Sequence, residues 1–189
     1  MVLQKKTDSW KLKKWYSVYA PKVFNNAIVG EMPANEDKAA VGRNIVIGLD
    51  LLTKNPSNAY TSVVLKVTEV SGNSAQTKLV SISQLYSYIR SLVRRYRSVS
   101  TSVVPVKTRD GIGMVVKMIV ITRARNTHSR IIGIRKEVNS AVESYFKEND
   151  SDTAISAIVE GKFQAGLAAR LSHIAPLNKV EVRRLDIKE

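Results

Sequence analysis

The spacing of apolar residues along the chain predicts a set of β-strands. In residues 61–70, Val63, Leu65 and Val67 recur at the two-residue period that places side chains on one face of a strand. The same criteria predict further strands at residues 13–18, 43–49, 76–80 and 179–187. Turns are expected at residues 55–58 and 71–73, so that the strand at 76–80 pairs back onto 61–70.

A β-hairpin is the clearest local signal in the sequence. Two β-rich runs, residues 99–108 and 112–122, flank Asp110-Gly111. Asp-Gly suits a tight type I′ turn, which needs a positive φ at both central residues. Pro105 cannot donate to a ladder and is expected at an edge or a bulge. Residues 114–121 are apolar apart from Lys117, which predicts a strand covered on both faces.

A 3.6-residue period predicts one helix before this hairpin. Ser83 suits its N-cap, the helix is expected to run to about Arg97, and Tyr96 completes its core-facing stripe. Arg90, Arg94 and Arg97 would then stack on another face of this helix. Like charges at that spacing cost a few tenths of a kcal/mol per pair, a cost that a bound phosphate backbone offsets.

A helical segment, residues 127–175, is predicted after the hairpin. A polar, basic loop at residues 123–130 leads into a helix that ends at about residue 147. One or two helices follow within residues 152–172, broken near Gly161 and stopped by Pro176. Residues 21–42 are polar and interrupted by glycine and proline, so we expect a loop or a partly disordered arm there. One domain is expected for residues 1–189, with a basic N-terminal arm at 1–12.

The net charge of +14 is concentrated in two regions of the chain. Residues 1–22 hold six lysines against one aspartate, a net +5. Residues 90–136 hold twelve basic residues against one aspartate, a net +11, so the rest of the chain is slightly acidic. A surface that needed only solubility would mix the two signs. This segregation favours a polyanionic partner, above all RNA.

The sequence offers little for catalysis, metals or cofactors. It has no cysteine, and its two histidines, His128 and His173, lie far apart without ligand-spaced neighbours. The glycines of 111–113 lack the third glycine and following helix of a dinucleotide loop. Asp150 and Asp152 suit a helix cap better than an acid–base pair. No apolar run approaches a membrane span. We expect a soluble, intracellular protein that is no enzyme and has no cofactor, metal or membrane partner.

The candidate RNA-binding residues are basic side chains of the two regions together with one arginine, one histidine and one tyrosine. They are Lys5, Lys6, Lys11, Lys13, Lys14, Tyr16, Arg43, Arg90, Arg94, Arg95, Arg97, Arg123, Arg125, His128, Arg130, Arg135 and Lys136. Arginine binds phosphate bidentately and stacks on bases. Trp15 is expected to pack on the core, whereas Tyr16 suits either packing or base stacking. Lys117 is a weaker candidate, because its side chain can snorkel from a strand.

Several short blocks, in a characteristic order, carry a resemblance to a known family. They are Lys13 to Tyr16 with Ala20-Pro21 and Phe24-Asn25, Val41-Gly42-Arg43, Val106-Lys107-Thr108 with Asp110-Gly111, His128-Ser129 with Ile134-Arg135-Lys136, and Pro176-Leu177 with Val182-Arg183-Arg184. The chain resembles the ribosomal protein S-one-e family of archaeal and eukaryotic small subunits. It lacks the C-terminal extension of the eukaryotic members, which points to the archaeal branch.

This resemblance implies a fold and a function. The fold is α+β, with an antiparallel β-barrel-like core and flanking helices. The function is a structural one in the cytoplasmic small ribosomal subunit, binding ribosomal RNA on the platform near the path of messenger RNA exit. The implied partners are small-subunit RNA, neighbouring platform proteins and messenger RNA near the exit. Two alternatives stay open: a free RNA- or DNA-binding chaperone-type factor, and an enzyme acting on nucleic acid, which would need clustered carboxylates that the basic regions lack.

Overall fold

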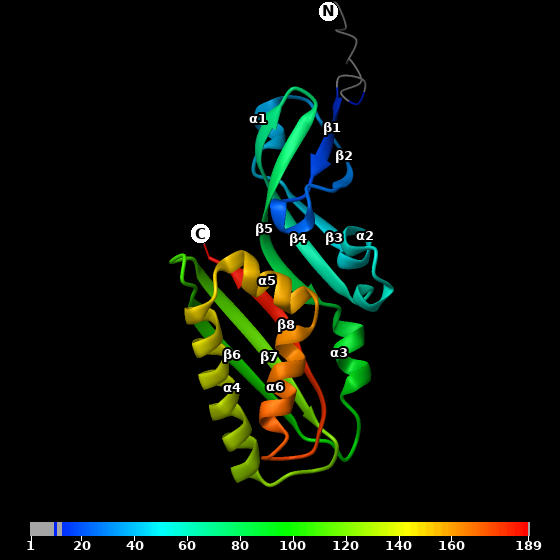
Figure 1. Ribbon diagram of the computed structural model, residues 1–189. Helices are drawn as coiled ribbons and strands as arrows, with labels where there is room; N and C mark the ends of the chain where they lie inside the picture. The colour runs from blue at the N-terminus through cyan, green and yellow to red at the C-terminus, as the bar shows by residue number, and fades with distance from the viewer. Residues whose placement is uncertain (1–9, 11–12, 189) are drawn as a thin grey trace, which may run out of the picture. The chain divides into compact units, whose positions relative to one another are not determined.

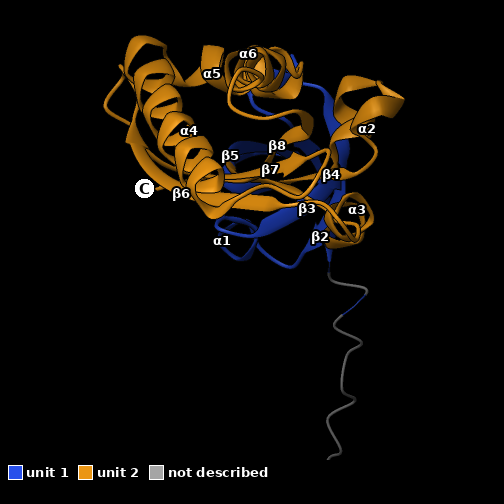
Figure 2. Cartoon of the chain, turned by 90° about the horizontal axis from the view of Figure 1, so that it is seen from below, with its two compact units in different colours: residues 1–47, 64–79 blue, residues 48–63, 80–189 orange. Residues whose placement is uncertain are grey.

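The computed structural model describes residue 10 and residues 13–188 of the chain (Figure 1). The chain divides into two compact units, coloured separately in Figure 2. Unit 1 comprises Met1–Ile47 and Val64–Leu79, and unit 2 comprises Gly48–Val63 and Val80–Glu189. Apart from Trp10, the predicted N-terminal arm at 1–12 lies outside the described residues.

Unit 1 is a small sheet with its own core. Its elements are β1 (Lys14–Tyr19), η2 (Lys22–Phe24), β2 (Ile28–Ala34), α1 (Asp37–Ala40), β3 (Asn44–Gly48, its last residue in unit 2) and the adjoining halves of β4 (Thr61–Ser71) and β5 (Ser74–Gln84). Strand β1 pairs antiparallel with β2 and parallel with β5. Alternate residues of β1, Tyr16 and Val18, pack with Met32, Val67 and Ala75 in this core.

Residues 21–42 are more ordered than the sequence predicts. They contain β2 and α1, so the prediction of a loop or disordered arm is wrong. Pro33 does not prevent strand formation because β2 pairs only with β1 and is therefore an edge strand, where a proline is tolerated. Met32 and Ala34, two residues apart, are both buried, which is the two-residue period of a half-buried strand.

Unit 2 contains an antiparallel sheet with helices on both faces (Figure 1). Its remaining elements are α2 (Leu49–Thr53), η3 (Pro56–Asn58), α3 (Tyr86–Leu92), β6 (Val99–Lys107), β7 (Gly113–Thr122), α4 (His128–Glu148), α5 (Ser151–Val159), α6 (Lys162–Leu171) and β8 (Leu177–Ile187). The strands run in the order β5-β8-β7-β6, so β8 lies between β5 and β7. Helix α4 packs on β6 and α6 on β8.

Strand β7 is covered on both faces only over its second half, so the prediction for residues 114–121 is confirmed in part. Val115 and Lys117 of the first half are half-buried. Met118, Ile119, Val120 and Ile121 are all buried. Ile119 and Ile121 pack with Ile89 of α3, so their alternation with Met118 and Val120 turns the latter pair to the face that α4 and α6 cover.

The hairpin of β6 and β7 is confirmed, but its turn differs from the predicted type. Gly111 has φ +79°, whereas Asp110 keeps a negative φ, so the type I′ prediction is wrong. The Gly111 N–H donates to Thr108 O at 2.9 Å, and the Thr108 N–H donates to Ile112 O at 3.1 Å. This is a longer loop with a single left-handed glycine. Pro105 lies on the edge strand β6, where it was expected.

The sheet as a whole is open rather than closed into a barrel. Backbone pairing connects eight described strands along the path β2-β1-β5-β8-β7-β6, with β4 beside β5 and β3 beside β4. Strands β2 and β6 end this path without pairing to each other, and β1 pairs parallel with β5. The predicted mixture of sheet and flanking helices is therefore confirmed, but a barrel-like antiparallel core is not formed.

The helix before the hairpin is shorter than predicted. Helix α3 covers only Tyr86–Leu92, and Ser83, the expected N-cap, lies inside β5. Arg94 and Arg97 are consequently in a loop, and the predicted stack of three arginines on one helical face is wrong.

The helical segment after the hairpin is confirmed, with different bounds. Helix α4 already begins at His128, ahead of the predicted start, so Arg130 lies in its first turn rather than in a loop. Gly161, at φ +78°, separates α5 from α6, where the break was expected. No helix among the described residues is long and apolar enough to span a membrane.

Candidate nucleic-acid interface

Two basic loops of unit 2 are held side by side at one end of the β6–β7 hairpin. The Ser98 N–H donates to Thr122 Oγ1 and the Thr122 N–H donates to Ser98 O, both at 3.0 Å. The Asn126 N–H donates to Ser98 Oγ at 3.0 Å. Thr122 is buried and lies where β7 ends, at the lower end of Figure 1. Residues 93–98 and 123–127 are therefore fixed against each other.

These two loops carry five arginines, which we call the arginine cluster. Its members are Arg94, Arg95, Arg97, Arg123 and Arg125. All are exposed except Arg97, which is half-buried. A hollow of about 390 Å³ is lined by Arg95, Tyr96, Arg97, Ser98 and Arg125. Side chains nearly thirty residues apart thus meet in one place.

The positive charge of the cluster is not neutralised within the protein. Among the described residues, no arginine of the cluster forms an ion pair with a carboxylate, and Asp110 is the only acidic residue between positions 85 and 136. Ion pairs occupy other basic side chains of unit 2. The pairs are Lys117–Asp186, Arg184–Asp186, Arg170–Glu137, Lys179–Glu181, Lys162–Glu160 and Lys147–Glu143.

The start of α4 adds to this positive potential. His128 and Arg130, both exposed, lie in its first turn, which holds no acidic residue. A helix N-terminus carries a partial positive charge, so cations there are unfavourable and an anion is favourable. The side chain of Thr127, the N-cap residue, does not cap a backbone N–H of the helix, and its hydroxyl lies 3.4 Å from Ser129 Oγ. A phosphate group bound here would relieve both conditions.

The remaining candidates of unit 2 lie on helices. The Arg90 guanidinium lies 5.7 Å from the centre of the Tyr86 ring on α3. Arg135 and Lys136 are exposed further along α4. None of these three lines the hollow.

The described basic candidates of unit 1 lie at or just before the starts of β1 and β3. Lys14 is exposed at the start of β1, and the Lys13 ammonium lies 4.0 Å from the centre of the Trp10 ring. Arg43 is exposed, and its guanidinium donates to Pro33 O at 2.9 Å. Lys5, Lys6 and Lys11 lie outside the described residues.

Of the adjacent aromatic residues Trp15 and Tyr16 in β1, Tyr16 is the one that packs in the core. Tyr16 is 0% exposed, so its ring cannot stack on a base. Its hydroxyl donates to Asp37 Oδ1 at 2.6 Å, and this bond, with burial and the charge of the carboxylate, raises the pKa of Tyr16. Trp15 is 53% exposed and does not pack on the core as expected.

Tyr96 lines the hollow beside the arginines but was not among the predicted binding residues. The helical pattern places it in a core-facing stripe, whereas the helix ends at Leu92 and Tyr96 is 84% exposed. The sequence does contain a signal, since the Arg94-Arg-Tyr-Arg97 run surrounds an aromatic residue with cations.

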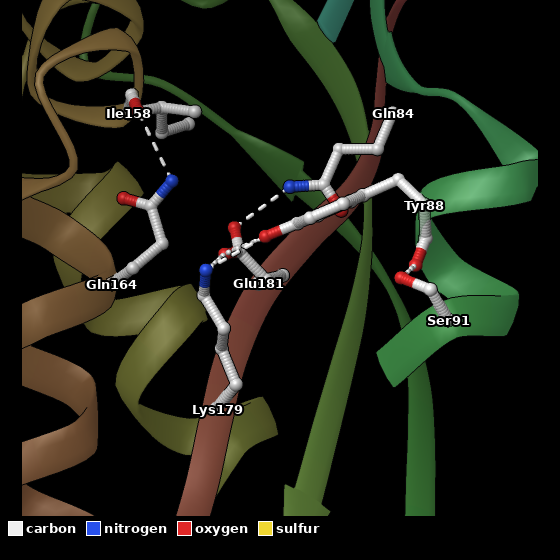
Figure 3. Close-up of polar contacts among 7 residues, drawn as sticks. All are labelled: Gln84, Tyr88, Ser91, Ile158, Gln164, Lys179 and Glu181. Carbon is white, nitrogen blue, oxygen red and sulfur yellow. Dashed lines mark hydrogen bonds and ion pairs between the residues drawn. The ribbon is translucent and has the colours of Figure 1, made fainter. Parts of the chain in front are cut away.

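A separate cavity of about 540 Å³ in unit 2 is the alternative candidate site, and Figure 3 shows the polar contacts around it. Glu181 accepts from Gln84 Nε2 at 2.7 Å and from the Tyr88 hydroxyl at 3.3 Å. The Lys179 ammonium donates to Tyr88 Oη at 2.7 Å, and this bond raises the pKa of Lys179. Tyr60 stacks on Tyr88 with ring centres 4.9 Å apart.

The charged groups of this cavity satisfy one another. This network of hydrogen bonds connects β8 with β5 and α3. The lining of the cavity includes no histidine or cysteine. Across the described part of the chain, no three histidine, cysteine, aspartate or glutamate residues could hold a metal ion together. His173 follows α6, and its Nδ1 lies 2.6 Å from Arg170 O. The arginine cluster is therefore the stronger candidate.

Comparison with known proteins gives consistent matches along nearly the whole chain. A family model described as the ribosomal S3Ae family matches residues 2–189. A protein of Methanococcus vannielii named small ribosomal subunit protein eS1 is 33% identical over 188 residues, covering 96% of this chain and 83% of that protein. The protein of the same name from Sulfolobus acidocaldarius is 35% identical over 178 residues, covering 94% and 90%. That from Pyrobaculum aerophilum is 33% identical over 182 residues, covering 96% and 82%.

Proposed function

The chain belongs to the ribosomal S3Ae family, and from this premise we propose that it is a structural constituent of the small ribosomal subunit that binds ribosomal RNA through the arginine cluster. The family predicted from the sequence, archaeal branch included, is confirmed by these relatives. Their printed name supports the ribosomal role, and in archaea such proteins are cytoplasmic. Ribosomal RNA and other ribosomal proteins are the partners that this role implies.

The unneutralised charge of the cluster is the observation that carries the RNA-binding proposal. The five arginines lie on two loops that hydrogen bonds hold together, and they have no carboxylate partner among the described residues. Other basic side chains of the same unit form ion pairs with carboxylates. Guanidinium groups bind phosphate oxygens bidentately, and each neutralised phosphate releases condensed counterions. The cluster binds RNA mainly through phosphates, which position the protein without reading the sequence.

The finer location and the further contacts are also part of the proposal. The family resemblance supports a place on the platform near the path of messenger RNA exit, beside other platform proteins. His128 and Arg130 at the start of α4 extend the cluster, and Arg90, Arg135 and Lys136 provide outlying phosphate contacts. Lys13, Lys14 and Arg43 of unit 1, with Lys5, Lys6 and Lys11, provide a second basic contact region.

The test is the salt dependence of RNA binding by a double variant, Arg95→Ala with Arg125→Ala. Both side chains line the hollow, so their loss should weaken binding to small-subunit RNA and flatten the plot of log affinity against log salt. The expected flattening is roughly one unit for each lost phosphate contact.

The matched control is the double variant Arg170→Ala with Arg184→Ala. It removes the same charge, but its arginines are paired with Glu137 and Asp186. The control should keep the wild-type slope. If both double variants change the slope equally, binding follows net charge alone and the proposed surface is wrong.

A further inference from the structure

We propose that Tyr96 stacks on an unpaired base of the bound RNA while the arginines around it hold the adjoining phosphates. This inference rests on the proposed RNA-binding function and deepens it. It names the chemical class of the ligand at the hollow as a nucleotide whose base is not paired in a duplex.

The exposure of the Tyr96 ring is the first observation. Tyr96 is the most exposed large apolar side chain in the described part of the chain. Among those residues its ring makes no aromatic contact and no cation–π contact, unlike Tyr86, Tyr88 and Tyr60 nearby in the same unit. A ring face without a partner is available to a base.

The backbone at Tyr96 is the second observation. Its φ is +63°, in the left-handed region that a bulky L-residue adopts only at a cost in energy. No packing of the ring within the fold compensates for this cost. The strained conformation instead holds the side chain out between Arg95 and Arg97.

The surroundings of the ring are the third observation. Tyr96 shares its hollow with Arg95, Arg97 and Arg125. The hollow is held in place by the bonds of Ser98 to Thr122 and by Arg97 Nη1, which lies 3.4 Å from Leu92 O at the end of α3. An aromatic face flanked by guanidinium groups is the arrangement that binds single-stranded nucleic acid, because the ring takes the base and the cations take the backbone.

The same arrangement of ring and guanidinium groups favours an unpaired base in the hollow over a base inside a duplex or a protein partner. Inside an RNA duplex both faces of each base are covered by neighbouring bases, so only an extruded or single-stranded base can stack on the ring. A protein partner that buried Tyr96 would also have to cover three guanidinium groups that lack carboxylates on this side. RNA phosphates neutralise those groups directly.

The experiment compares two RNA hairpins with the same stem, one carrying a single bulged 2-aminopurine and one fully paired. Binding and 2-aminopurine fluorescence are measured for the full chain, for Tyr96→Phe and for Tyr96→Gly. Phenylalanine keeps the ring face, and glycine removes the ring but adopts φ +63° without strain. The unfolding midpoint of Tyr96→Gly should therefore be no lower than that of the wild type, which excludes misfolding as an explanation.

The wild type and Tyr96→Phe should quench the fluorescence and bind the bulged hairpin about tenfold more tightly than the paired one. Tyr96→Gly should lose both effects while its salt slope stays unchanged, because no phosphate contact is removed. Persistence of the preference in Tyr96→Gly, or its loss in Tyr96→Phe, would overturn the stacking of a base on this ring.

Two further outcomes separate this inference from the proposed function. If the wild type shows no preference but Arg95→Ala with Arg125→Ala still weakens binding, the cluster binds RNA and Tyr96 does not stack. If Tyr96→Gly changes neither hairpin but lowers incorporation of the chain into small subunits, the ring contacts a protein and the inference is wrong.

Discussion

Single residues decide which side of each strand is buried, and Tyr16 shows how. Its hydroxyl bond to Asp37 belongs to the folded protein alone, so the raised pKa is a property of the folded state. A group whose pKa is raised on folding contributes stability that is fully present below its ordinary pKa, here about 10.0, and is lost as pH rises through the folded value.

Tyr16→Phe should therefore lower the free energy of unfolding at neutral pH and make its decline above pH 10 shallower than in the wild type. Urea unfolding at a series of pH values measures both effects. Other groups with raised pKa, such as Tyr145 and Lys179, are common to both proteins and cancel in the difference. Tyr86→Phe, at an exposed position, is the control and should follow the wild-type curve. Parallel curves for Tyr16→Phe and the wild type would mean that the bond to Asp37 contributes nothing.

Residue patterns predict burial only where the phase of the period is known. Val63, Leu65 and Val67 fix the phase of their strand, and all three are buried. The positions that alternate with them are polar except for Val64. In β1, Trp15 and Tyr16 are adjacent and both aromatic, so either phase satisfies the pattern. The partner that decides between them is Asp37, which lies 21 residues away in the sequence.

Elements are joined at the interface by Thr122, which connects the end of β7 to both basic loops. Its hydroxyl accepts from the Ser98 N–H and donates to Ala124 O at 2.7 Å. Thr122→Val keeps the shape of the side chain but leaves a shielded N–H without its partner, at a cost of about 1–3 kcal/mol. The affinity for RNA should fall as well, because the loops that carry Arg97 and Arg123 lose their alignment.

Chemical unfolding and RNA titration measure these two effects of Thr122→Val. Thr101→Val, an exposed substitution in the same hairpin, is the matched control and should change neither quantity. If Thr122→Val is as stable as Thr101→Val, the hydrogen bonds of the Thr122 hydroxyl do not hold the two loops together.

Element boundaries were predictable where turn chemistry marks them and not elsewhere. Asp110-Gly111 and Gly161 mark a turn and a helix break, and both are found. The apolar pattern of residues 85–96 continues past Leu92, but the helix does not. The sequence has no glycine or proline to announce this end. Another helical turn would place Arg94 four residues after Arg90, and like charges at that spacing disfavour a helix. The charge of the sequence predicted the arginines that form the cluster, whereas the loop geometry that holds them and the exposure of Tyr96 were not predicted.

The whole molecule is expected to behave as an integral component of a ribonucleoprotein particle. We predict that in a sucrose gradient of cell lysate, after a high-salt wash, the chain stays with the small-subunit peak in proportion to other ribosomal proteins. Many phosphate contacts together with protein neighbours keep it there, although each contact alone is weakened by salt. Sedimentation in the light fractions would instead indicate a free RNA- or DNA-binding factor.

The order in which the strands pair across the sheet could not be predicted from the sequence. Strands were expected at most of the correct positions, but pairing between residues far apart in the sequence leaves no local pattern. Ser81 pairs with Asp186 and Ser17 pairs parallel with Ser74, and neither pairing follows from the strands' own sequences. The barrel was expected from the family resemblance. The open path of the sheet shows that closure into a barrel can be predicted only when the pairing of the strands is known.

The place of β8 in that path has a consequence for how the protein is made. Strand β8 is the last to be synthesised, yet it fills the middle of the sheet of unit 2, between β5 and β7. A growing chain therefore carries two unpaired strand edges until residue 187 has left the ribosome that translates it, and such edges promote aggregation. All residues of unit 1 precede Val80, so they are synthesised before most of unit 2. A chain released early would keep the N-terminal basic region but lack the sheet that supports the arginine cluster.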